Sequence, residues 1–295
     1  MGPASWHKEV MKDMINAGVN VFRVNFSHGD YETHRRTIRL VKELNEEFNC
    51  KTAVLADLQG PKLRIGDVED GAIINEGDVL TFTTNKVRGT AKLVYMNYQQ
   101  FPQDVNAGER ILLDDGKLMC EVLETNKKDT VVTKVIQGGP LKSKKGVNLP
   151  NTKVSLPCLT KKDLEDVVVA MEEGVEWIGL SFVRDAADVQ ELRKVINDFG
   201  SFAKIVSKIE KPEAVVDIDN IIDATDAIMV ARGDLGVEIP YSSSDSHFTT
   251  TMVYSRVPQE QMGTLAWGQN WAALAQGLSR RLASFSFPIE CPKEN

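Results

Sequence analysis

Four segments of the sequence place charged and polar side chains directly after short apolar runs. The groups in them that could carry chemistry are Arg23, Asn25, Ser27 and His28; Asp57 and Arg64; Lys208 and Glu210; and Arg232 and Asp234. Carboxylates are ligands that Mg²⁺ prefers, arginine offers a planar fork to phosphate oxygens, and lysine supplies a compact point charge. Together they predict phosphoryl transfer, in which a protein mainly positions groups and neutralises charge.

Segment 226–240 is organised like a site at the end of a buried strand. Its apolar run at 227–231 is short enough for such a strand, and the residues RGDLG follow. Gly233 and Gly236 allow close approaches that a Cβ would block. Asp234 then offers a hard oxygen ligand to a metal. Taken alone, the segment is equally compatible with a strand followed by a capped turn.

The other candidates have structural alternatives as well. Lys208 and Glu210 alternate along a strand and could form an ordinary surface pair, and Arg23 could form a structural ion pair. Asn25, Ser27 and the histidine after them are compatible with a loop that caps the next turn. Because four such groups follow four strands, we favour the functional interpretation.

The elements that must position these groups follow from apolar periodicity. Ser5 is the expected cap of the first helix, Thr160 and Asp163 form an acidic capping box, and Pro212 opens a helix. The expected helices are 5–17, 31–48, 160–174, 187–199 and 212–222, and the expected strands are 19–26, 52–56, 176–182, 204–209 and 227–231. Such repeats imply parallel strands. No glycine-rich dinucleotide fingerprint follows the first strand, which favours a TIM (β/α) barrel over an open sheet, with its site at the carboxyl-end face.

Between 67 and 150 the pattern of apolar and turn-forming residues differs from that of the flanking sequence. Short β-type runs alternate with turn signals and no long helical period appears, so we expect an inserted small β-barrel-like domain. The expected division is 1–66 for the first part of the barrel, 67–150 for the insert, 151–240 for the second part of the barrel and 241–295 for an atypical tail. The tail has few charges and no strand that we would predict, although 267–282 could form a short amphipathic helix.

Composition excludes several classes of protein. A net charge of −7 without a basic block argues against nucleic-acid binding. No apolar run approaches the ~20 residues of a membrane span, and no secretory leader is visible. The four cysteines are widely scattered, which favours free buried thiols in a reducing cytoplasm over structural zinc.

Five motifs resemble those of pyruvate kinases in order and spacing. They are RVNFSHG at 23–29, DLQGPKLR at 57–64, KGVNLP at 145–150, SKIE at 207–210 and MVARGDLGVEIP at 229–240. The resemblance covers about 2–240. It implies a (β/α)-barrel interrupted by a mobile B domain that closes over the nucleotide, and a reaction in which phosphoenolpyruvate and ADP give pyruvate and ATP. Members of the family are usually tetrameric.

The resemblance also implies roles for individual residues. Arg23 corresponds to the substrate-phosphate arginine, and Lys208 to the lysine that stabilises the transition state. The implied Mg²⁺ (or Mn²⁺) ligands are Glu210 and Asp234, with the backbone of Gly233 and Asp234 near the substrate. The implied nucleotide-binding residues are Asn25, His28, Arg64 and Lys145, and the implied K⁺ site consists of Asn25, Ser27, Asp57 and the carbonyl of Leu58.

The sequence departs from the family pattern in three respects. Lys62 stands where K⁺-dependent members carry glutamate, which suggests independence of K⁺. The family's first barrel strand has no counterpart. The last barrel units and the C-terminal domain are missing or replaced after Pro240, so we expect an incomplete TIM (β/α) barrel. In the family the missing units help to close the substrate pocket, and turnover by this chain is therefore doubtful. The alternatives are an inactive fragment that binds only Mg²⁺ or nucleotide, and a Mg²⁺-dependent oxo-acid lyase barrel.

Overall fold

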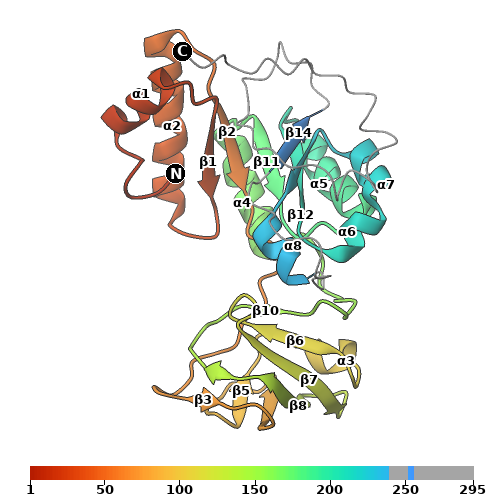
Figure 1. The fold of residues 1–295 in the computed structure, drawn as a ribbon. Coiled ribbons are helices and arrows are strands. Elements are labelled where there is room, and N and C mark those ends of the chain that lie inside the picture. Colours follow the sequence, from red (N-terminus) through yellow and green to blue (C-terminus); the bar gives the residue numbers. More distant parts are fainter. Residues whose placement is uncertain (239–251, 256–295) are drawn as a thin grey trace, which may run out of the picture.

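A curled, mostly parallel sheet forms the framework of the protein. The computed structural model describes residues 1–238 and 252–255 (Figure 1). Its six-stranded sheet has the order β1-β2-β11-β12-β13-β14. The strands are β1 (Val21–Asn25), β2 (Ala53–Asp57), β11 (Trp177–Leu180), β12 (Lys204–Ile209), β13 (Ala227–Val230) and β14 (Met252–Ser255). The first five pair in parallel, so their carboxyl ends meet at one edge. This arrangement is the expected incomplete TIM barrel.

Helices cover one face of this sheet. They are α1 (Lys8–Asn16), α2 (Tyr31–Phe48), α4 (Lys161–Glu172), α5 (Ala186–Phe199), α6 (Pro212–Val216), α7 (Ile218–Ala224) and α8 (Arg232–Glu238). The main core joins them to the strands, with Ile38 and Val41 of α2 in one cluster with Ile205 of β12. The opposite face holds a smaller cluster that contains Leu55 and Trp177. Both faces of the strands are thus apolar, as parallel strands in a barrel require.

The insert forms a second sheet with its own core, drawn below the barrel strands in Figure 1. The sheet has the order β10-β6-β7-β8-β4-β5, and β3 pairs with β9. Its elements are β3 (Ile73–Ile74), β4 (Val79–Thr83), β5 (Leu93–Tyr95), α3 (Phe101–Asp104), β6 (Arg110–Leu113), β7 (Leu118–Thr125), β8 (Thr130–Gln137), β9 (Gly139–Pro140) and β10 (Val147–Asn148). We call this part of the chain the β module. Its strands are mostly antiparallel, which accounts for the frequent turn signals in the sequence.

The capping box predicted for α4 is present. The Thr160 hydroxyl accepts a hydrogen bond from the Asp163 amide at 3.1 Å, and the Asp163 carboxylate accepts one from the Thr160 amide at 2.9 Å. Asp163 is fully buried and also accepts the amide of Gly60 at 3.0 Å. One carboxylate therefore caps a helix and fixes the chain that leaves β2.

Three sequence-based expectations are wrong in detail. Ser5 does not cap α1, which begins at Lys8, because residues 2–5 form a turn in which the Ser5 hydroxyl bonds to Gly2. The single helix expected at 212–222 is broken at Asp217 into α6 and α7. A further strand, β14, was not expected; it pairs antiparallel with β13 and satisfies backbone groups that an open edge would expose. The helix expected at 267–282 lies outside the described residues.

The cysteines agree with the expectation in part. Cys120 and Cys158 are free and buried, and burial raises the pKa of the Cys120 thiol to about 11. Cys50 is free but only half-buried. Cys291 lies outside the described residues. Within residues 1–238 and 252–255, no helix has the length and apolar character needed to cross a membrane.

Asp163→Ala should lower the free energy of unfolding by about 2 to 4 kcal/mol, because it removes a helix cap and leaves buried amides without partners. Urea denaturation measures this loss. Asp198→Ala is the control, since the pair of Asp198 with Lys194 on α5 is exposed. Equal effects of the two substitutions would contradict the role of Asp163.

Candidate active site

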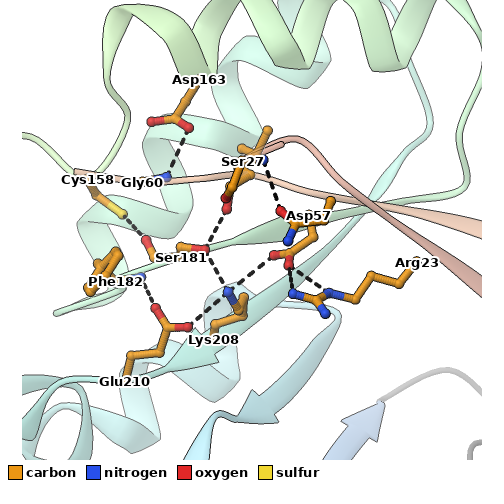
Figure 2. Close-up of polar contacts among 12 residues, drawn as sticks. Arg23, Ser27, Asp57, Gly60, Cys158, Asp163, Ser181, Phe182, Lys208 and Glu210 are labelled. Carbon is orange, nitrogen blue, oxygen red and sulfur yellow. Dashed lines mark hydrogen bonds and ion pairs between the residues drawn. The ribbon is translucent and has the colours of Figure 1, made fainter. Parts of the chain in front are cut away.

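The carboxyl ends of four neighbouring strands bring five polar residues into one cluster. They are Arg23 from β1, Asp57 from β2, Ser181 after β11, and Lys208 and Glu210 from β12 and its end (Figure 2). The parallel register places Asn25 opposite Asp57 and Gly179 opposite the same aspartate. Residues that are distant in sequence therefore share one edge of the sheet.

Lys208 lies at the centre of this cluster. Its ammonium nitrogen is 2.9 Å from Glu210 Oε1 and 3.2 Å from Asp57 Oδ1, and it donates to Ser181 Oγ at 2.8 Å (Figure 2). Burial lowers the pKa of Lys208, but the two carboxylates outweigh burial and the net shift is upward. The side chain therefore stays a cation although only 11% of it is exposed.

Glu210 is held from two sides. Its Oε1 faces Lys208, and its Oε2 accepts the amide of Phe182 at 2.8 Å. Burial raises the pKa of Glu210, Lys208 opposes that shift, and the negative charge of Asp234 adds to it. Asp234 itself is exposed on α8. A divalent cation bound by both carboxylates would offset this unfavourable effect of Asp234 on Glu210.

Arg23 is held by Asp57 at the other side of the cluster. Its Nε donates to Asp57 Oδ2 at 2.7 Å, and its Nη2 binds the same oxygen. Half of the arginine side chain is exposed, whereas Asp57 is buried. Gly179 makes room for this carboxylate, because a Cβ there would lie 3.2 Å from Asp57 Oδ1. Arg23 thus offers a fixed guanidinium to a ligand from solvent.

The turn after β1 and the residue after β2 contain the other polar candidates. Asn25 Oδ1 accepts the amide of Ser27 at 2.9 Å, which is the turn-capping contact considered above as the structural alternative. The carbonyl of Leu58 accepts the hydroxyl of Ser181 at 2.6 Å. His28 is exposed. These oxygens lie near Asp57, but each is already engaged by a neighbour.

The remaining candidates lie toward the β module. Arg64 Nη1 donates to the carbonyl of Lys144 at 2.6 Å, and Lys145 pairs with Asp114 at 2.8 Å. No contact joins either to Lys208 or Glu210 within the described residues. Lys62 lies two residues before Arg64: burial lowers its pKa, the charges of Arg64 and Lys208 lower it further, and Asp234 and Asp115 oppose that shift. The charge of Lys62 is thus affected both by Arg64 and by Lys208 of the polar cluster.

Residues 1–255 match the family described as pyruvate kinase, barrel domain. The chain belongs to this family. It is 42% identical over 245 residues to pyruvate kinase 2 of Synechocystis sp., and 43% identical over 243 residues to pyruvate kinase of Geobacillus stearothermophilus. Each alignment covers 81% of this chain but 41% of the relative. With pyruvate kinase of Corynebacterium glutamicum the identity is 41%, over 81% of the chain and 50% of the relative. The chain thus spans about half the length, or less, of these pyruvate kinases.

Sequence reasoning missed Ser181 and Phe182. They are the first two residues after β11, at the same edge of the sheet as the other candidates, but neither is charged. Phe182 has a φ of 56°, which turns its amide toward Glu210. The only available signal was their position at the carboxyl end of the strand expected at 176–182, of which the structure forms Trp177–Leu180. Within the described residues, no group of three or more His, Cys, Asp or Glu side chains forms a ready metal cage.

Lys208→Met should destabilise the fold more as the pH rises from about 5 to about 8. The pKa of Glu210 is already above its ordinary value of 4.5 and rises further without the lysine. A carboxyl with a raised folded pKa stabilises the fold at low pH, and that contribution is lost as the pH rises through the folded pKa. Urea midpoints at several pH values measure the effect. Lys194→Met, which removes an exposed cation, is the control; a pH-independent loss in Lys208→Met would contradict the coupling.

Proposed function

We propose that this chain carries the phosphoryl-transfer site of a pyruvate kinase, with phosphoenolpyruvate and ADP as substrates and pyruvate and ATP as products. The observation that carries the proposal is the buried Lys208 ammonium, held between Glu210 and Asp57 beside the exposed guanidinium of Arg23. Two fixed cations at the carboxyl edge of a parallel barrel sheet suit a migrating phosphoryl group. The relatives of this chain that are named pyruvate kinase support the same reaction.

Each group has a part in this reaction. Arg23 would bind the phosphate of phosphoenolpyruvate, and Lys208 would stabilise the charge that develops as the phosphoryl group moves to ADP. The backbone of Gly233 and Asp234 would lie along the substrate. The enolate that remains must then be protonated at carbon to give pyruvate. Asn25, His28, Arg64 and Lys145 would contact the nucleotide, which requires Lys145 to leave Asp114.

Glu210 and Asp234 fit a divalent cation, Mg²⁺ or Mn²⁺. The fit rests on the chemistry of the donors: burial raises the pKa of Glu210, the negative charge of Asp234 adds to that shift, and a cation between two such carboxylates would be stabilised by both. When bound, such an ion neutralises phosphate and enolate charge. Lys208 already bonds to one oxygen of Glu210, so the lysine holds that carboxylate in place for the ion.

The site implied for K⁺ is distinct from the site proposed for the divalent cation. The oxygens of Asn25, Ser27, Asp57 and Leu58 form the site that the family resemblance assigns to K⁺, and two of them are engaged by Ser27 and Ser181. Lys62 brings an ammonium into the field of Asp234 and Lys208. We propose that this ammonium takes the place of K⁺. We also propose the domain division at 66, 150 and 240, and an assembly of several copies.

Pyruvate formation tests the main proposal. Purified chain supplied with phosphoenolpyruvate, ADP and Mg²⁺ should release pyruvate. A lactate-dehydrogenase-coupled assay measures that release. Lys208→Met should reduce the rate by about 10²-fold or more, because one preorganised charge at the transferred group is worth that much. Lys194→Met should leave the rate unchanged.

Other outcomes separate the alternatives. A folded chain that binds Mn²⁺ or ADP but forms no pyruvate would be a binding fragment only. Pyruvate released from a hydroxy-oxo acid without ADP would identify an oxo-acid lyase. Either result would overturn the proposed reaction.

Replacing K⁺ with an organic cation at equal ionic strength should leave the rate unchanged, because Lys62 supplies the charge from within the chain. Lys62→Gln should lower the rate and make it respond to added K⁺. The rate as a function of K⁺ concentration in both proteins is the measurement. Strong K⁺ stimulation of the unaltered chain would contradict the role of Lys62.

A further inference from the structure

The segment that returns from the β module to the barrel is attached on two sides. On the module side, the Thr152 hydroxyl donates to Glu109 at 2.6 Å, and Ser155 donates to Asp104 through its amide at 2.8 Å and its hydroxyl at 2.7 Å. The side chains of Val154 and Leu156 pack against the core of the module. Residues 152–156 therefore move with the module rather than with the barrel.

One side chain of the barrel, among the residues that the structure describes, donates to this segment at two points. Arg184, in the loop between β11 and α5, donates from Nη1 to the carbonyls of Val154 at 3.0 Å and Leu156 at 2.9 Å. Its other nitrogens are held by Asp188 of α5, with Nε 3.1 Å and Nη2 2.9 Å from the two carboxylate oxygens. This double pairing fixes the plane of the guanidinium. The remaining nitrogen is thereby aimed at the returning segment.

The loop that carries Arg184 also contacts the candidate active site. Two residues earlier, the Phe182 amide donates to Glu210; three residues earlier, Ser181 accepts from Lys208 (Figure 2). The hydroxyl of Ser181 donates in turn to the carbonyl of Leu58. Four consecutive residues, 181–184, therefore contact the returning segment at one end and the Lys208–Glu210 pair at the other.

We infer that Arg184 is a positioning residue that couples the β module to the Lys208–Glu210 pair. The inference rests on the proposed function in so far as that pair is the active site. Displacement of the module pulls on the carbonyls of Val154 and Leu156, and Arg184 transmits that displacement to the loop after β11. The backbone amide that orients Glu210 then shifts. One loop thereby connects the β module, which carries the proposed nucleotide-binding residue Lys145, to the Glu210 carboxylate on the barrel.

Amide hydrogen exchange tests this coupling without requiring activity. In Arg184→Lys, one ammonium cannot hold Asp188 at two points and also bind two carbonyls. Exchange at the amides of Phe182 and Ser155 should therefore become about tenfold faster, because both lose the same anchor against local opening. The matched control is Arg193→Lys on α5, the helix that carries Asp188: Arg193 pairs with Asp226 and is 30% exposed against 26% for Arg184. It should leave both amides unchanged.

Asp188→Asn provides a second variant if Arg184→Lys does not fold, because it retains Arg184 and weakens the contacts that orient it. It should also speed exchange at Phe182 and Ser155. The inference is overturned if the folded variant leaves the Phe182 amide unchanged, or if Arg193→Lys speeds exchange to the same extent.

Titration with Mn²⁺ alone separates this inference from the proposed function. We expect weaker Mn²⁺ binding in Arg184→Lys and unchanged binding in Arg193→Lys, because only the former releases the amide that orients Glu210. If the unaltered chain binds no Mn²⁺, the proposed metal role fails. Exchange at Phe182 then decides the role of Arg184 by itself.

Discussion

The site depends on keeping one ammonium charged where most water is excluded. Burial by itself would favour neutral Lys208, and the carboxylates of Glu210 and Asp57 reverse that preference. The reverse also holds: the two carboxylates tolerate burial because the lysine lies between them. Each charge therefore requires the others. A set of this kind is costly to assemble and rigid once assembled, which suits a group that must face a developing charge without reorganising.

The barrel sheet provides that rigidity. Parallel pairing fixes Asn25 opposite Asp57 and puts Gly179 on the other side of that aspartate. The glycine leaves room for the carboxylate, and the carboxylate then holds both Arg23 and Lys208. Backbone geometry on three strands therefore determines where the cations lie. The β module has a separate core, so its orientation is set by a few polar contacts rather than by shared packing.

The polar contacts between the barrel and the chain of the β module or its returning segment are of two kinds. Arg184 binds backbone carbonyls of the returning segment, whereas Asn148 of β10 and Lys211 both donate to Glu238 at 2.8 Å. Glu238 is buried at the end of α8, four residues beyond Asp234. The module is thus linked to the barrel near both carboxylates of the candidate metal site. Polar links of this kind can be broken and remade at low cost, unlike an apolar interface.

Local patterns determined much of this protein before any coordinates. The apolar period at 31–48 gave α2 with its observed bounds, the Thr160–Asp163 pair gave the cap of α4, and 204–209 gave β12. Each depends on residues close together in the chain. The turn at Ser5, the break at Asp217 and the pairing of β14 were not predicted. The Ser5 hydroxyl bonds to Gly2, the Asp217 carboxylate accepts the amide of Ala186 from another helix, and β14 pairs with β13 across a long separation in sequence. The charged residues Arg23, Asp57, Lys208 and Glu210 could be identified as a group by type and position. Which of them pair, and the contributions of the uncharged Ser181 and of the Phe182 amide, were decided only by the tertiary structure, because parallel strand register brings together backbone and side-chain groups that no sequence spacing connects.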